Sequence, residues 1–174
     1  MKLFIRRPIS IYLIGLFIFP TIVYVSKGFA MSLLKHPEEE IVLSSPFEGV
    51  ITLNNKPVEG AKVVRVLTWF ETENATDSSL TDKDGRFVLP EVTKNLALNK
   101  IGEFVISQEM VVLYEGKEYP IWTKAKWEKG LYGELGGKPE DFHCELSNEF
   151  KLVDAGKGML ATACNWSGIK GVEK

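Results

Sequence analysis

The chain has 174 residues, of which 45% are hydrophobic and 25% charged, and its formal net charge is -2. This length suits one domain with a short appendage, and the composition excludes a disordered, collagen-like or multi-span membrane protein. Residues 1–30 contain four basic and no acidic residues, so the rest of the chain, with 17 basic and 23 acidic residues, carries a charge of -6. An acidic body argues against a nucleic-acid partner, because phosphates require a basic surface.

The N-terminal segment is basic at its start and apolar after it. Lys2, Arg6 and Arg7 precede an uncharged run over residues 8–26, which is the pattern of a secretory signal peptide or a signal anchor. The apolar centre, about 17 residues long, is close to the minimum length that spans a bilayer. We expect residues 1–30 to form a hydrophobic helix, either cleaved as a signal peptide or retained as a membrane anchor. The rest is then exported, to the periplasm, the periplasmic face of the inner membrane or the medium.

Two alternatives to this export prediction remain open. Translation could start at Met31, which would remove the segment, or residues 1–30 could form a buried helix of a cytosolic protein. The next residues, 31–46, include a run of three glutamates at Glu38–Glu40 and end in Ser44-Ser45-Pro46. We expect them to form an extended polar linker between the N-terminal segment and the folded domain.

The front half of the body shows the two-residue period of strands. Residues 47–53 and 61–70 alternate or are rich in Val, and Asn54-Asn55-Lys56-Pro57 between them is a turn sequence. Residues 71–77 are polar and aperiodic and predict a loop. A short strand over 78–81 then leads into a hairpin turn at Asp82–Gly85, with Gly85 at the position of positive φ. A strand follows up to Leu89, and residues 91–100 predict a crossover, with at most one helical turn.

The back half continues the same pattern. Residues 104–115 and 118–127 predict a long antiparallel hairpin that reverses at Glu115-Gly116-Lys117. Residues 130–139 hold four glycines and a proline and predict an irregular loop. Residues 142–150 and 159–166 predict two final strands. Short strands at this spacing indicate an all-β fold, a seven- to eight-stranded antiparallel β-sandwich over residues 47–174, preceded by the N-terminal hydrophobic helix.

Two segments of the front half resemble a known family. Residues 47–64 contain the pattern G-x-(V/I)-x-x-x-x-x-P-(V/L)-x-G-A-x-V, and residues 81–90 contain T-D-x-x-G-x-(F/Y). Both patterns are similar to those of carboxypeptidase-regulatory-like domains, which have a transthyretin-like β-sandwich. The resemblance covers roughly residues 47–90, and it implies that fold, with close strand packing at Ala61 and Phe87 in the core.

The resemblance to carboxypeptidase-regulatory-like domains ends at about residue 90. After residue 100 the long hairpin, the glycine-rich loop and a cysteine-containing C-terminal extension depart from the family pattern. This combination is similar to a set of small bacterial proteins with such a front half. The resemblance implies a non-catalytic accessory or binding role and no peptidase activity.

Two cysteines, Cys144 and Cys164, lie near the C-terminus. In an exported protein such a pair favours a disulfide, which would stabilise the fold by about 3 kcal/mol for a loop of this length. Two buried free thiols or half of a metal site are the alternatives, and His143 beside Cys144 would point to the opposite face of a strand.

The chain shows no constellation for catalysis or cofactor binding. His36 and Glu39 match H-x-x-E, but they lie in the polar linker, and Asp82 and Asp84 lack the further acidic residues of a calcium loop. No nucleotide-binding or nucleophile motif is present. We therefore predict a protein that is not an enzyme and has no metal site and no cofactor.

A candidate binding surface lies on the predicted strand over residues 118–127. Strict alternation places Trp122 on one face with Lys124 and Lys126, and Tyr132 follows in the glycine-rich loop. Exposed Trp and Tyr are favoured at protein interfaces and sugar-binding surfaces. In the alternative interpretation, a loop covers Trp122 and the lysine stems fold over it.

These features favour an exported binding module with a protein partner in the cell envelope, a membrane contact through residues 1–30, and no nucleic-acid partner. The hairpin over residues 104–127 or the loop over residues 130–139 would bind the partner. One alternative is a carbohydrate-binding module that uses Trp122 and Tyr132 as a platform. Another is a periplasmic immunity or inhibitor protein whose acidic body blocks a basic toxin.

Overall fold

The computed structural model describes residues 37–70, 73–97, 104–155 and 157–169. The chain divides into two compact units, Met1–Pro37 and Glu38–Lys174, and the architecture below is that of the second unit. The predicted hydrophobic helix, Met31 and His36 lie outside the described residues. Within the described ranges, no helix has the length and apolar character needed to cross a membrane.

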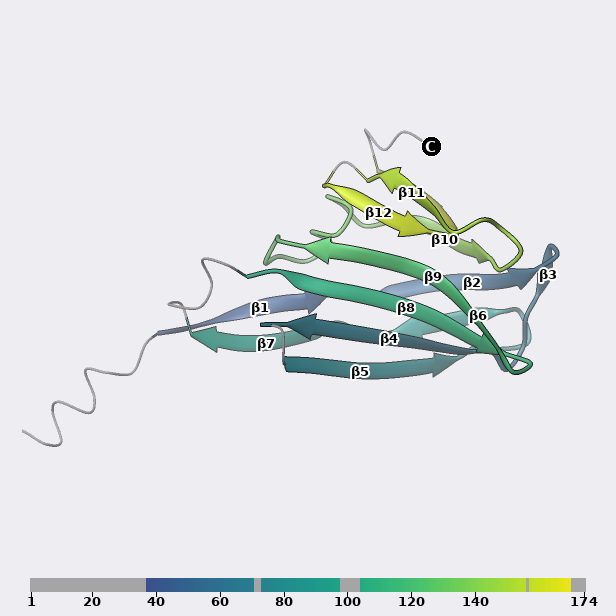
Figure 1. Cartoon of the computed structure of the whole chain (residues 1–174), viewed down its shortest axis with the longest axis horizontal. Coiled ribbons are helices and arrows are strands. Elements are labelled where there is room, and N and C mark those ends of the chain that lie inside the picture. The colour runs from purple at the N-terminus through teal and green to yellow at the C-terminus, as the bar shows by residue number, and fades with distance from the viewer. Residues whose placement is uncertain (1–36, 71–72, 98–103, 156, 170–174) are drawn as a thin grey trace, which may run out of the picture. The chain divides into compact units, whose positions relative to one another are not determined.

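The described part of the chain is all-β, as predicted, and its strands form three sheets (Figure 1). The strands are β1 (Glu38–Ser44), β2 (Phe47–Leu53), β3 (Lys56–Pro57), β4 (Lys62–Trp69), β5 (Glu73–Leu80), β6 (Arg86–Leu89), β7 (Val92–Ala97), β8 (Ile106–Tyr114), β9 (Lys117–Lys126), β10 (Glu140–Glu145), β11 (Lys151–Asp154), β12 (Met159–Thr162) and β13 (Cys164–Ser167). A six-stranded sheet has the order β11-β12-β9-β8-β4-β5. A five-stranded sheet has the order β13-β10-β2-β3 with β6 also on β2, and β1 pairs with β7.

The main core lies between the five-stranded and six-stranded sheets, as in a β-sandwich. Phe47, Trp122, Phe142 and Trp166, from four different strands, form an aromatic cluster with ring centroids 5.2–6.4 Å apart. A second apolar cluster, under the two-stranded sheet, is formed by Ile41, Leu43, Leu67, Trp69, Leu96, Phe104 and Ile106. The burial of these apolar side chains is the main term that stabilises the fold.

Several predicted features are confirmed. The turn between β2 and β3 has positive φ at Asn54 and Asn55, and the β8–β9 hairpin reverses at Glu115-Gly116. Gly85 has a φ of 73° and lies against the backbone of Ile51, so a side chain there would clash. Ala61 and Phe87 are buried in the core.

The predicted polar linker over residues 31–46 is wrong for its second half. Residues 38–44 form β1, which pairs antiparallel with β7 from Glu38 opposite Ala97 to Ser44 opposite Val92. Ile41 and Leu43 are fully buried on its inner side. The run of three glutamates made this segment look like a linker. A strand can still form there, because its side chains alternate between the two faces and only Ile41 and Leu43 have to face inward.

Two further segments differ from the prediction in the same way. The predicted loop over residues 71–77 contributes most of β5, and the predicted crossover over residues 91–100 contributes β7. Among the described strands, β5 and β7 each lie at the edge of a sheet. Both are polar on their exposed side, because one face of each strand is solvated. The turn at Asp82–Gly85 is present, but it connects β5 and β6, which belong to different sheets.

The C-terminal part forms four strands, where two were predicted, and raises the total above seven or eight. β11 and β12 extend the six-stranded sheet, whereas β10 and β13 belong to the five-stranded sheet. β10 pairs parallel with β2, an exception to the predicted antiparallel arrangement. At this contact, a side chain on Gly49 would lie 2.6 Å from the carbonyl oxygen of Phe142, so the glycine permits the close approach.

Candidate functional site

The predicted binding surface on β9 is wrong, because its residues point into the sandwich. Trp122 is 1% exposed, Lys124 2% and Lys126 0%. The alternative interpretation is correct in that Trp122 is buried, but the cover is the opposite sheet, through Phe47, Phe142 and Trp166, and not a loop. Tyr132 is partly exposed and lies in the loop that covers this end of the sheet.

A β-bulge explains which residues face inward. Met110 on β8 lies opposite Trp122 and Val111 opposite Pro120, so Ile121 has no partner of its own. Such an extra residue shifts the alternation by one position. Ile121 and Trp122 are therefore both buried, and Lys124 and Lys126 follow Trp122 onto the inner face.

Lys126 is the cation of a buried polar cluster. Its ammonium group donates hydrogen bonds to the carbonyl oxygens of Val42 (2.6 Å) and Gly130 (3.1 Å) and lies 3.6 Å from a carboxylate oxygen of Glu134. Burial lowers the pKa of Lys126, and the nearby Glu134 carboxylate opposes that shift. A buried charge needs such partners, because water no longer solvates it.

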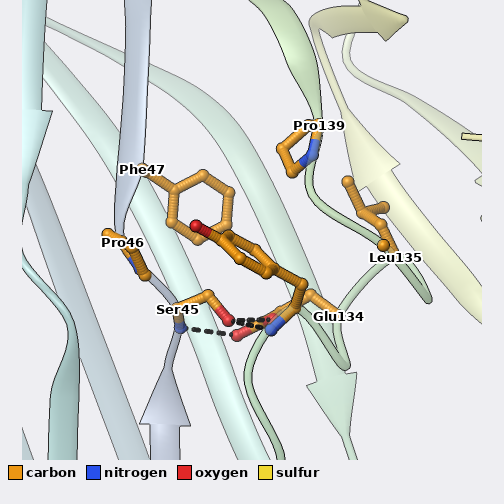
Figure 2. A pocket seen from close by; sticks show the side chains of 8 residues that line it. Ser45, Pro46, Phe47, Glu134, Leu135 and Pro139 are labelled. Carbon is orange, nitrogen blue, oxygen red and sulfur yellow. Dashed lines mark hydrogen bonds between the residues drawn. The ribbon is translucent and has the colours of Figure 1, made fainter. Parts of the chain in front are cut away.

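Glu134 is the anion of the same cluster and comes from the loop over residues 130–139. Its carboxylate accepts hydrogen bonds from the backbone N–H of Ser45 (2.9 Å), from the Ser45 hydroxyl (2.7 Å) and from the Gln108 amide (3.0 Å). Figure 2 shows the two bonds to Ser45. The glycine-rich loop is thus fixed to the junction of β1 and β2 and to the sheet.

A shallow depression lies beside this contact and is drawn in Figure 2. Pro46, Phe47, Leu135 and Pro139 surround it, and the backbone N–H of Tyr132 donates to the Ser45 hydroxyl at 2.6 Å. Its volume is about 10 Å³, which is the space of a single water molecule. The depression is therefore too small for a sugar or another organic ligand.

Arg65 on β4 extends the buried polar cluster toward β5. Its guanidinium group forms a two-pronged ion pair with Asp77 (2.9 and 2.6 Å) and donates to the Ser44 hydroxyl and the Pro90 carbonyl oxygen. Lys124 donates to the carbonyl oxygens of Lys157 and Gly158. These inner-face charges are used to hold neighbouring segments together.

A second polar cluster surrounds Glu145 at the end of β10. Its carboxylate accepts hydrogen bonds from the Thr52 hydroxyl, from the N–H groups of Asn54 and Asn55, and from the N–H and hydroxyl of Ser147. Burial raises the pKa of Glu145, but these hydrogen bonds outweigh it and lower the pKa to about 2. A carboxylate held ionised by five donors fastens the β2–β3 turn and is a poor general acid or base.

The predicted disulfide between Cys144 and Cys164 is present and joins directly opposite residues of β10 and β13. Among the described residues, no three His, Cys, Asp or Glu side chains gather as a metal site would require. Asp82 accepts from the N–H groups of Asp84 and Arg86, so it forms the turn as expected.

The outer face of the six-stranded sheet is the surface that the sequence prediction missed. The pairing of β4, β8, β9, β12 and β11 places five outward residues side by side in one row: Val66, Glu109, Thr123, Ala161 and Leu152. The outward neighbours on the central strands are also small and neutral: Val64, Thr68, Ser107, Val111 and Ala125. Among the described residues Glu109 is the one charge in this central area, and Lys62, Glu118 and Asp154 are outward charges at its border.

Exposed apolar side chains border this neutral area, which we call the outer face. Leu80 and Leu113 both lie opposite Lys62 at one end, Leu152 lies on the edge strand β11, and Met159 and Trp127 lie toward the other end. Leu152 is 64% exposed and Trp127 56%. Residues 123 and 125 point outward because of the bulge at Ile121, which no local sequence pattern marks.

Comparison with known proteins places this fold in a family. Residues 47–149, from β2 to the region after β10, match the family described as a domain of unknown function (DUF6795). Neither the curated proteins nor the solved structures contain a match. Since the matched segment covers more than half of the sequence, the chain belongs to the DUF6795 family.

Proposed function

We propose that this protein is an exported, non-enzymatic binding module that recognises a protein partner of the cell envelope on the outer face of its six-stranded sheet. The observation that carries the proposal is the composition of this face. Central Val, Thr, Ser and Ala side chains are bordered by exposed Leu80, Leu113, Leu152, Met159 and Trp127. Apolar patches of this kind on soluble domains mark interaction sites.

The β8–β9 hairpin lies at the centre of this face, which supports the hairpin over the glycine-rich loop as the binding element. The loop is fastened through Glu134, whereas Glu109, Thr123 and Leu113 on the hairpin are exposed. A strand face that is rigid in advance loses little conformational entropy on binding.

A protein partner is favoured over a sugar or a basic toxin. The proposed sugar platform required Trp122, which is buried, and of the four tryptophans Trp127 is the exposed one. A basic toxin would require a continuous acidic surface, but the outer face mixes its outward carboxylates, those of Glu109, Glu118 and Asp154, with Lys62 and neutral side chains. A partner with an equally neutral, apolar surface fits this face best.

Export is supported by the N-terminal sequence and by the disulfide. Cys144 and Cys164 are bonded, and structural disulfides persist mainly in oxidising compartments. Alkaline phosphatase fused to the C-terminus tests this part of the proposal, because that enzyme is active only after export. An inactive but stable fusion would contradict it.

A non-enzymatic role is supported by the use of the buried ionisable groups. Lys126, Glu134 and Glu145 are each hydrogen-bonded to backbone or hydroxyl groups within the fold. All three side chains are also buried, so a substrate in solvent could not reach them in this conformation.

Site-specific photo-crosslinking in cells tests the binding proposal. A benzoylphenylalanine residue replaces Leu152 on the outer face or, as the matched control, Val88 on β6, which is 57% exposed in the five-stranded sheet. We expect the Leu152 probe to give one discrete adduct with another envelope protein and the Val88 probe to give none. No adduct at Leu152, or the same adduct at both positions, would contradict the proposal.

A further inference from the structure

In the part of the chain that the structure describes, β5 is the terminal strand of the six-stranded sheet and no strand pairs with its outer edge, while the side chain of Ser79 near its end accepts a hydrogen bond from the N–H of Val88 on β6 at 3.4 Å. Within the described residues it pairs with β4 alone, through eight consecutive residue pairs from Glu73 opposite Trp69 to Leu80 opposite Lys62. The register contains no bulge. Figure 1 shows β5 as the outermost strand beside β4.

This edge lacks most of the features that normally prevent strand pairing, and its two inward-facing charged residues, Glu73 and Asp77, are both in ion pairs within the chain. Free edges are commonly protected by lysine, proline, a bulge or a short length. β5 has eight residues and contains no Lys, Arg or Pro, whereas β11, at the opposite edge, has four residues and includes Lys151. β7 carries Lys94.

The two acidic residues of β5 are each paired with a basic residue of the same chain, at positions that are partly exposed to solvent. Glu73 forms an ion pair with Lys94 at 2.7 Å, and Asp77 forms one with Arg65 at 2.6 Å. The outward side chains of the strand, Asn74, Thr76 and Ser78, are uncharged and exposed. An identical strand can therefore approach this edge without net repulsion.

We propose that a second copy of this chain pairs with β5 in antiparallel orientation around a two-fold axis, which joins the two six-stranded sheets into one. In the register we favour, Thr76 lies opposite Thr76 of the partner subunit, and Asn74 lies opposite Ser78 of the partner subunit. The neighbouring register would place Asp77 opposite Asp77 of the partner subunit, and like charges in that position are destabilising.

A second copy fits this edge better than an unrelated strand, because the chain itself supplies a neutral strand of equal length with its own free edge. A single pair of strands buries an area at the low end for specific interfaces, so the dimer is weak and depends on concentration. The outer face stays uncovered in this arrangement, and the two copies present it side by side. The inference is therefore independent of the proposed partner binding.

Cysteine crosslinking of the full chain in mild detergent tests the register. Directly opposite Cβ atoms are about 5 Å apart, whereas residues displaced by four positions are about 13 Å apart. We expect oxidation to link Thr76→Cys to itself. Asn74→Cys alone and Ser78→Cys alone should form no disulfide-linked dimer. A mixture of these two variants should give a linked dimer.

Sedimentation equilibrium of charge variants tests the association itself. Thr76→Lys places two lysines opposite each other, and we expect the dimer dissociation constant to rise about tenfold or more. Thr123→Lys, on the exposed face of β9, is the matched control and should leave dimerisation unchanged.

Three outcomes would overturn the inference: a monomer at all accessible concentrations, equal effects of the two lysine variants, or a Thr76→Cys crosslink to a different protein. The last outcome would show that a strand of another chain occupies this edge. None of the three depends on whether the Leu152 probe captures a partner, so the failure of one proposal is distinguishable from the failure of the other.

Discussion

On the inner face of the six-stranded sheet, ionisable side chains are buried and paired, whereas at the centre of the outer face mostly neutral side chains are partly exposed and have no cover among the described residues. Lys126 and Arg65 point inward and donate to carbonyl and carboxylate oxygens. Thr123 and Val66, on the same strands, point outward.

Charged residues in the sequence therefore do not identify the exposed face of a strand. A buried charge is tolerated where several hydrogen bonds replace its hydration, and here those bonds fasten β1 and the glycine-rich loop. We conclude that the contacts of the inner face hold the fold together, and we propose partner binding for the outer face alone.

The largest expected effect is that of removing the buried anion. Glu134→Ala leaves Lys126 buried without its carboxylate and removes the acceptor of the Ser45 bonds, so we expect the free energy of unfolding to fall by about 3–5 kcal/mol. Glu134→Gln retains an acceptor and should lose about 1–2 kcal/mol. Urea unfolding measures both, and a loss below about 1 kcal/mol for Glu134→Ala would show that this cluster does not stabilise the fold.

The second largest expected loss of stability comes from removing the disulfide. Replacing both Cys144 and Cys164 by Ala removes a crosslink with a sequence separation of 20, and we expect a loss of about 3 kcal/mol in the free energy of unfolding. The oxidised wild type should lose a similar amount on addition of a reductant, while the double variant should not respond. A response of the double variant would mean that the reductant acts elsewhere.

A smaller effect concerns the pH dependence of stability. The pKa of Glu145 is lowered to about 2 in the folded chain, so its contribution is fully present above its ordinary pKa of 4.5 and is lost as the pH falls toward 2. Urea unfolding at pH 7 and pH 3 should show a smaller difference for Glu145→Gln than for the wild type. Glu149→Gln, at an exposed position four residues further along the chain, serves as the control and should behave like the wild type.

The sequence predicts the regular parts of this fold well. Strand β2, the β8–β9 hairpin and the turns at Asn54-Asn55 and Gly85 follow from alternation and turn chemistry, which are local properties. The disulfide follows from the number of cysteines and the predicted compartment.

The remaining parts depend on contacts between distant segments. The bulge at Ile121 reverses the predicted faces of β9, and no local pattern marks it. β1 depends on its pairing with β7, and the parallel contact of β10 with β2 depends on Gly49. The candidate site was missed for the same reason, since the outer face can be identified only after the bulge is placed.

The different roles of the two sheet faces are tested most directly by two neighbours on β9 that point to opposite faces, Trp122 and Thr123. Trp122→Phe should lower the free energy of unfolding by about 2 kcal/mol and leave the crosslink from the Leu152 probe intact. Thr123→Lys should change the free energy of unfolding by no more than about 0.5 kcal/mol and abolish that crosslink. The reverse result, in which Trp122→Phe abolishes the crosslink and Thr123→Lys leaves it intact, would contradict the division between a structural inner face and a binding outer face.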